Sequence, residues 1–149
     1  MATSKSLDIL CFGDSLTSGY YAMGLMTHPY SMAFRTKVQA ALPDTAINVY
    51  TNGSPGDVAS FPAFQQRLRN ECAKRHYDWV IILGGTNDLA YRVPTEAMYK
   101  TFQANCDIPL RKGSKVLALT IPESKAKPGW VVKARNDINS LILAHTQTN

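Results

Sequence analysis

Four apolar runs of strand length lie along the chain, with longer segments between them. Their cores are DILCF, INVY, WVIIL and VLALTI, within residues 7–12, 47–51, 79–83 and 115–121. The cores are nearly continuous rather than alternating with polar residues, which is typical of strands covered on both faces, as in a parallel sheet. The pattern therefore predicts four buried, parallel strands.

The segments between these runs have apolar residues at helical spacing. Apolar residues recur every four positions from Tyr30 to Leu42, and Pro43 then ends the pattern because proline cannot continue a helix. The same spacing predicts three further helices, over residues 61–72, 95–110 and 131–145. Since strand and helix alternate throughout, we expect an α/β layered domain with right-handed crossovers.

The length and the charge fit one ordinary globular domain. The 149 residues can bury a core, and no repeat, low-complexity tract or linker divides them, so residues 1–149 are expected to form a single domain. The net charge of +5 is spread along the chain rather than gathered in a basic arm. We therefore expect no nucleic-acid partner.

The cysteines and the first residues bear on the compartment. Three cysteines are scattered without CxxC spacing, which argues against a disulfide framework or a zinc site and fits a reducing environment. The opening MATSKS lacks the apolar core of a signal peptide, and no stretch approaches the roughly 20 apolar residues of a membrane span. We therefore expect a cytoplasmic protein without a membrane span.

A polar or glycine-rich stretch follows each predicted strand. These stretches read GDSLTSG, NGSPGD, GGTND and PESKAKPG. In open parallel sheets the ligand crevice lies beyond the carboxyl ends of the strands. The four stretches are therefore expected to converge on one edge of the sheet, where a functional site should lie.

Ser15, in the first stretch, has three possible roles. It could cap a helix, since Asp and Ser are favoured at helix N-termini, or its turn could hold a phosphate. It could also be a nucleophile, which needs a base and donors for the oxyanion that forms on attack. The amides of Ser15 and Gly56 and the side-chain amide of Asn87 could be those donors. Turn and cap roles for Gly56 and Asn87 stay open on this evidence.

Taken in order, these motifs resemble those of the SGNH, or GDSL-type, serine hydrolases. The matching blocks are Gly13 to Leu16, the glycine Gly56 (with Gly53 as the less favoured carrier of that role), and Gly85 to Asp88. The resemblance extends over most of the chain, from residue 8 to about residue 145. It implies a three-layer, flavodoxin-like α/β fold with a parallel sheet.

The resemblance also implies an activity. Ser15 would be the nucleophile of a lipase or esterase that cleaves a small carboxylic ester through an acyl-enzyme, with Ser15, Gly56 and Asn87 forming the oxyanion hole. The family works without a metal or organic cofactor, so none is expected. The apolar stretch YYAMGLM, residues 20–26, could line an acyl pocket. Further candidate substrate-binding residues are Asp14, His28 and Trp130.

One departure from the family concerns the general base. The family's last block is an Asp-x-x-His that follows one more strand, and this sequence contains no Asp-x-x-His. We therefore expect a chain that lacks the family's last strand and helix, with a sheet edge open to self-association. His28 is the alternative base, whereas His76 and His145 are expected away from the site.

Two other hypotheses remain. The chain could be a non-catalytic flavodoxin-like module that holds a phosphate, although Asp14 would be unfavourable beside an anion and no Walker or Gly-x-Gly-x-x-Gly motif is present. It could also be a catalytically dead relative kept for protein association. Labelling by a fluorophosphonate separates the esterase hypothesis from both.

Overall fold

Four parallel strands form the main sheet, in the order β4-β1-β5-β6. The structure is a computed structural model that describes residues 5–125 and 128–145. The strands span Lys5–Gly13 (β1), Thr45–Gly53 (β4), Trp79–Leu83 (β5) and Lys115–Ala118 (β6). The predicted parallel α/β sheet is therefore confirmed, with strands where the near-continuous apolar runs lie.

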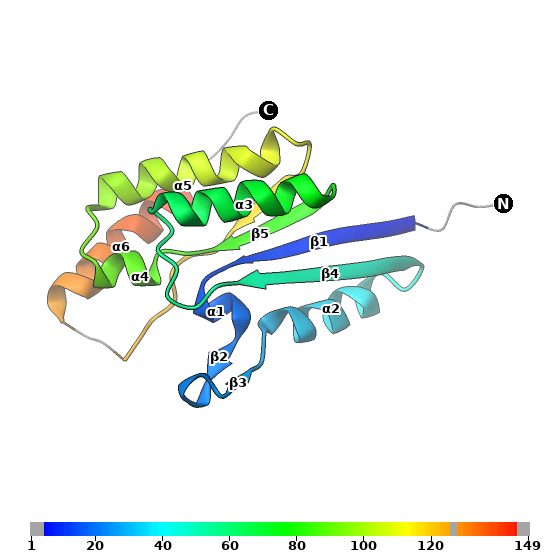
Figure 1. Cartoon of the computed structure of the whole chain (residues 1–149), viewed down its shortest axis with the longest axis horizontal. Coiled ribbons are helices and arrows are strands. Elements are labelled where there is room, and N and C mark those ends of the chain that lie inside the picture. The colour runs from blue at the N-terminus through cyan, green and yellow to red at the C-terminus, as the bar shows by residue number, and fades with distance from the viewer. Residues whose placement is uncertain (1–4, 126–127, 146–149) are drawn as a thin grey trace.

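Helices cover both faces of this sheet. Helix α2 (Tyr30–Ala41) lies on one face, and α3 (Pro62–Lys74) and α5 (Thr95–Leu110) lie on the other (Figure 1). Helix α6 (Gly129–Ala144) packs against α5 and against the short helix α4 (Thr86–Ala90). The fold is therefore the predicted three-layer α/β arrangement.

Each face of the sheet has its own apolar core, because successive side chains of a strand point to opposite faces. Leu10 and Phe12 of β1 are fully buried towards α3 and α5, where Phe12 meets the edge of Phe64 at 5.1 Å between ring centroids. Ile9 and Cys11 are buried towards α2. The sheet is thus held from both sides at its centre, β1.

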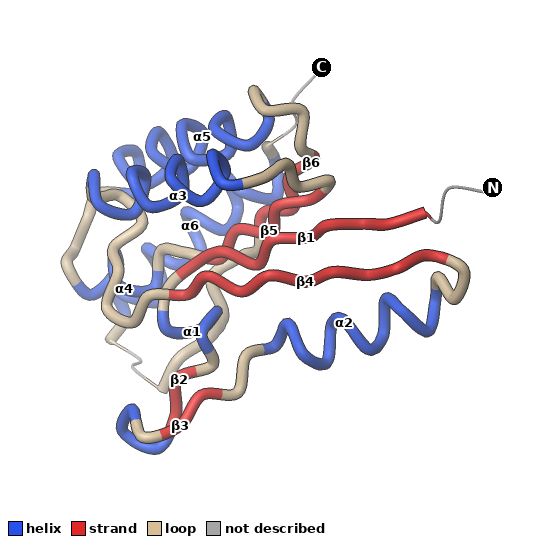
Figure 2. Tube along the Cα trace, turned by 45° about the vertical axis from the view of Figure 1, so that its right-hand side comes forward, coloured by secondary structure: helices blue, strands red, loops and turns tan. Residues whose placement is uncertain are grey.

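Several short elements near the carboxyl ends of the strands are not evident from the sequence. They are α1 (Ser15–Ser18), β2 (Tyr20–Tyr21), the 3₁₀ helix η1 (Ala22–Gly24) and β3 (Met26–Thr27). Strands β2 and β3 form a small antiparallel hairpin that stands away from the main sheet (Figure 2). Met23 and Leu25 at its tip are 94% and 85% exposed, and the role of this stretch in lining an acyl pocket stays a prediction.

Strand β6 is shorter than predicted. The apolar run extends to Ile121, but the strand ends at Ala118, and Leu119 still donates its N–H to the Ile82 carbonyl at 2.9 Å. The side chain of Asn139 in α6 then bonds the backbone of Ile121, as a neighbouring strand would. It accepts the Ile121 N–H at 2.8 Å and donates to the Ile121 carbonyl at 2.9 Å. The chain therefore leaves the sheet before the apolar run is finished.

The register of the central strands aligns their carboxyl ends. Gly13, the last residue of β1, lies opposite Gly53 of β4 and Leu83 of β5. A Cβ at Gly13 would meet the Leu83 carbonyl and the Thr17 side chain well inside contact distance. Only glycine allows this approach, which brings the segments after β1, β4 and β5 together.

Candidate active site

Ser15 begins the short helix α1, directly after β1. The Asp14 side chain caps this helix by accepting the Leu16 N–H at 2.9 Å, and the N–H of Gly19 closes it on the Ser15 carbonyl. Ser15 is half-buried, and within residues 5–125 and 128–145 its hydroxyl has no hydrogen-bond partner. Its amide is in the first turn of the helix, where N–H groups have no intrahelical acceptor. Both groups are therefore available to a ligand.

The buried carboxyl group of Asp14 holds this turn in place. Its side chain is 1% exposed, and the second carboxyl oxygen has no hydrogen-bond partner in the described part of the chain. Burial raises the pKa of the Asp14 carboxyl above its usual range, against the lowering effect of the Leu16 hydrogen bond. The charges of Asp88 and Asp57 raise this pKa further. Such burial fits a turn-forming role rather than the direct substrate contact expected from the sequence.

Gly56 lies in a turn just beyond β4. The Asp57 N–H donates to the Ser54 carbonyl at 3.2 Å, with Pro55 and Gly56 between them and Gly56 at φ +82°. This order of residues is that of a type II turn, which needs a positive φ at its third position. Gly56 is exposed, and its N–H meets no acceptor among the described residues.

Asn87 follows β5, in the first turn of α4, and is tied to the glycine turn. Its side-chain amide donates to the Asp57 carbonyl at 2.7 Å, which uses one of its two N–H groups. The neighbouring Asp88 carboxylate accepts the N–H groups of Ala59 and Ser60, both at 2.8 Å. The segment after Gly56 is thus held against α4 at three points.

The structure therefore brings Ser15, Gly56 and Asn87 to the same carboxyl edge of the sheet. The Ser54 N–H donates to the Gly13 carbonyl at 3.0 Å and links the glycine turn to β1, as Asn87 links it to α4. A hydroxyl that a base deprotonates can attack a carbonyl carbon, and N–H groups that face the same point can hold the resulting oxyanion.

Among the described residues, no hydrogen bond joins the side chain of His28 or Trp130 to Ser15, Gly56 or Asn87, although the His28 N–H donates to the carbonyl of Gly19, at the end of α1, at 2.7 Å. The exposed His28 lines a surface hollow with Arg35 and Thr51, and Ser15 is not part of that lining. Trp130, in the first turn of α6, is 42% exposed and carries the guanidinium of Arg92 at 4.4 Å from its ring centroid. Their roles in substrate binding stay predictions.

His145 and His76 lie elsewhere, as expected. His145 follows α6, and its Nδ1 is 2.9 Å from the Tyr99 hydroxyl, beside a hollow lined by the first residues of β5 and β6. It is half-buried rather than the exposed helix-end residue that its position indicated. His76 precedes β5, at the amino end of the sheet.

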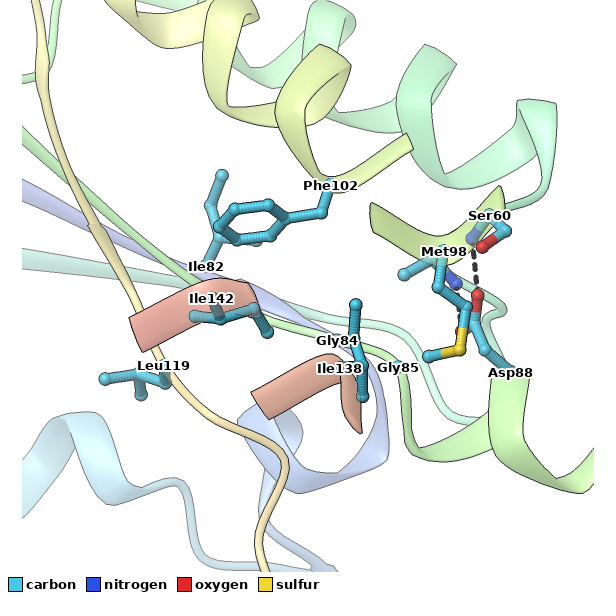
Figure 3. Close-up of a pocket in the computed structure, with 11 residues that line it drawn as sticks. Ser60, Ile82, Gly84, Gly85, Asp88, Met98, Phe102, Leu119, Ile138 and Ile142 are labelled. Carbon is cyan, nitrogen blue, oxygen red and sulfur yellow. Dashed lines mark hydrogen bonds between the residues drawn. The ribbon is translucent and has the colours of Figure 1, made fainter. Parts of the chain in front are cut away.

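A small cavity lies behind the candidate site, between α4, α5 and α6. Figure 3 shows Met98 and Phe102 of α5 and Ile138 and Ile142 of α6 around it, with Asp88 turned towards Ser60 at its rim. Its volume of about 30 Å³ would hold a water molecule or a methyl group. Ser15, Gly56 and Asn87 do not line it, so it belongs to the core rather than to the site.

Two residues that form an ion pair at this edge, Arg67 and Asp57, were not predicted from the sequence. The Arg67 guanidinium forms an ion pair with Asp57 at 2.8 Å. A signal was present, because Arg67 lies three residues after Phe64 and one before Leu68, on the face of α3 that is buried. Charged side chains on the buried face of a helix indicate specific partners, and Glu71 is a second one on this face.

Across residues 5–125 and 128–145, no group of three His, Cys, Asp or Glu side chains could hold a metal ion. In the same residues, no helix combines the length and the apolar character that crossing a membrane requires.

The family of the chain follows from its sequence. Residues 11–148 match the model of the GDSL-like lipase/acylhydrolase family, so the chain belongs to that family of hydrolytic enzymes. No match to a curated protein was found. The family assignment made from the sequence motifs is therefore confirmed.

Solved structures share the fold. The chain resembles AlinE4, described as an SGNH-hydrolase family esterase, with a TM-score of 0.73 and 22% identity over 94% of this chain and 70% of that one. A lipase/acylhydrolase from Enterococcus faecalis has a TM-score of 0.69 and 22% identity, covering 93% and 72%. A mutant acetyl-xylooligosaccharide esterase from Geobacillus has 0.71 and 18%, covering 96% and 73%. At these identities the likeness shows the SGNH-type fold alone.

Proposed function

We propose that this protein is a serine esterase that cleaves small carboxylic esters through an acyl-enzyme on Ser15. The Ser15 hydroxyl oxygen attacks the ester carbonyl carbon while its proton passes to water. The bond from that carbon to the alcohol oxygen then breaks, and the alcohol leaves with a proton taken from water. Water then attacks the acyl-serine and releases the acid. The observation that supports this best is the arrangement of Ser15, Gly56 and Asn87, which follow three different strands, at one sheet edge.

The same residues are proposed as the oxyanion hole. The second N–H of the Asn87 amide and the amides of Gly56 and Ser15 are donors without charge that can face one developing oxyanion. Such donors act in the transition state more than in the ground state, because the charge appears only on attack.

The proposal assigns no general base. No Asp-x-x-His occurs in the sequence, and among the described residues no hydrogen bond joins the Ser15 hydroxyl to the histidines at positions 28, 76 and 145. A serine without a positioned base keeps the contribution of its oxyanion hole and of binding, about 10³–10⁴-fold over water in the worked triad case. We therefore expect slow turnover from the 149 residues alone.

The substrate is proposed to be an ester with a short acyl group. Among the solved structures of this fold is an acetyl-xylooligosaccharide esterase. The exposed tip of the β2–β3 hairpin and the closed cavity behind α4 offer no deep apolar channel for a long chain. Activated acetyl esters are therefore the first substrates to use.

Hydrolysis of p-nitrophenyl acetate tests the proposal. Ser15→Ala should abolish enzymatic turnover, whereas Ser140→Ala, at an exposed serine of α6, should keep the parental rate. Equal turnover in the parent and in Ser15→Ala would remove Ser15 as the nucleophile.

A catalytically dead association module is the second candidate. It is favoured by one observation, the absence of a hydrogen-bond partner for the Ser15 hydroxyl within the described ranges. No turnover by the parent, together with self-association, would support it.

A further inference from the structure

The side chain of Arg67, in α3, extends to the carboxyl ends of β1 and β4. Its side chain is 22% exposed, and its guanidinium carbon lies 4.0 Å from the centroid of the Phe12 ring. The guanidinium therefore lies over the ring of Phe12, at the buried end of β1.

The hydrogen bonds of this guanidinium join three separate segments. Nη2 donates to the carbonyl of Gly13, the end of β1, at 2.7 Å. Nη1 donates to the carbonyl of Asn52 in β4 at 3.0 Å and to its side-chain oxygen. Nε and Nη2 both donate to one carboxylate oxygen of Asp57, at 3.0 and 2.8 Å.

Two of these acceptor residues lie close in sequence to a proposed catalytic group. Gly13 lies two residues before Ser15, and Asp57 directly follows Gly56. The carbonyl of the same Asp57 accepts the Asn87 amide at 2.7 Å. We propose that Arg67 is a positioning residue, which holds the Gly56 and Asn87 donors in place relative to Ser15. This inference rests on the proposed function.

A second layer orients the acceptors. The Asn52 side chain donates to Glu71 at 2.8 Å, which turns its oxygen towards Arg67, and the Tyr77 hydroxyl donates to the other Glu71 oxygen at 2.7 Å. Tyr77 is 1% exposed and Glu71 is 8% exposed, so this support is fixed in the core. A connected chain of polar groups thus leads from the core to the glycine turn.

Lysine at position 67 would keep the charge and lose this geometry. An ammonium donates from a single point, so it can satisfy Asp57 or the two strand carbonyls and cannot span all three segments. We expect the turn at Gly56 to shift relative to Ser15. Small displacements of catalytic groups reduce rate rather than substrate binding, because alignment matters most in the transition state.

Saturable labelling of Ser15 by an alkyl fluorophosphonate tests this in the full chain. Arg67→Lys should lower the maximal labelling rate about 10- to 100-fold, with the half-saturating concentration nearly unchanged. Asp57→Asn should act in the same direction, and the double variant should be no worse than the more damaging single change, since both break one link. Arg69→Lys is the matched control, because Arg69 lies on the exposed side of α3 and bonds only to Gln65 among the described residues.

Amide hydrogen exchange gives a readout that does not need activity. Arg67→Lys should speed exchange of the Asp57 amide, which closes the glycine turn, while Arg69→Lys should not. If the parent is never labelled but this exchange changes, the proposed function fails and the positioning role stands. A labelling rate in Arg67→Lys equal to that of the parent would overturn the inference. If the parent is not labelled, an Asp57 amide that exchanges at the same rate in Arg67→Lys as in the parent would overturn it.

Discussion

At the scale of single residues, Asp14 has a buried carboxyl group and directly precedes the proposed nucleophile, Ser15. Its pKa is raised, chiefly by burial, so the folded state holds its proton to higher pH than the unfolded chain does. The free energy of unfolding therefore falls as pH rises from the ordinary Asp range, about 3.9, through the raised value, and stays lower above it.

Asp14→Asn removes this titration and should show the effect directly. Its Oδ1 can still accept the Leu16 N–H. The stability of the variant relative to the parent should increase as pH rises above about 4, because only the parent loses stability in that window. Denaturant unfolding at several pH values measures it, with Asp137→Asn, at an exposed ion pair of α6, as the control. A difference between variant and parent that does not change with pH would contradict the assignment.

Asn87→Ala tests the oxyanion donor. Loss of its amide should lower kcat for p-nitrophenyl acetate by about 10²–10³ with a smaller change in KM, as expected for a donor that acts on the developing charge. Asn136→Ala, at an exposed position in the middle of α6, should leave both constants unchanged. Loss confined to KM would show that Asn87 binds substrate without stabilising the transition state.

At the scale of elements, close packing of β1 on its neighbours determines the geometry of the edge. Gly13→Ala should destabilise the fold by about 1–3 kcal/mol, because the added Cβ meets the Leu83 carbonyl and the Thr17 side chain. Gly129→Ala, where an added Cβ meets nothing within 4 Å, should be neutral or slightly stabilising. Thermal unfolding of the two variants measures the difference, and equal melting temperatures would contradict the packing argument.

The long elements could be predicted from the sequence, and the short ones could not. The apolar runs of β1 and β5 are continuous because both faces are buried, which gives a strong local signal. Helix α1 has four residues, which is too short to give an apolar repeat in the sequence, and it is bounded by the Asp14 cap and the closure at Gly19. The end of β6 is likewise set by Asn139, which is distant in sequence.

The same distinction holds for the site. Ser15, Gly56 and Asn87 follow predicted strands, so their common edge could be expected from topology. The role of Arg67 could not, because two of its acceptors are backbone carbonyls, which the sequence does not mark.

At the scale of the whole molecule, the two edges of the sheet differ. The outer edge of β4 is covered by α2, where Arg35 donates to the Ile47 carbonyl at 3.2 Å and Gln39 bonds both the Thr45 carbonyl and the Ile47 N–H. Beside β6, an apolar groove of about 240 Å³ lies on the α2 face. Its lining residues are Leu7, Ile9, Phe34, Val38, Trp79, Ile81 and Leu117.

We therefore expect the 149-residue chain to associate through the β6 edge and the adjoining face. An uncovered strand edge beside apolar surface favours pairing with another chain. Leu117, 46% exposed on β6, is the residue to change, and Leu117→Lys should lower the apparent mass in light scattering without lowering the melting temperature. Leu143→Lys, at a 76% exposed site of α6, should not. A monomeric parent would contradict this expectation.

The identity of the nucleophile is the central claim, and covalent labelling measures it most directly. The folded parent is incubated to completion with an alkyl fluorophosphonate, and the adduct is located by mass spectrometry of the intact chain and of its peptides. We predict a single adduct on Ser15, which forms slowly and is absent from Ser15→Ala. No adduct on the folded parent, an adduct at another residue, or equal labelling of Ser15→Ala would contradict it.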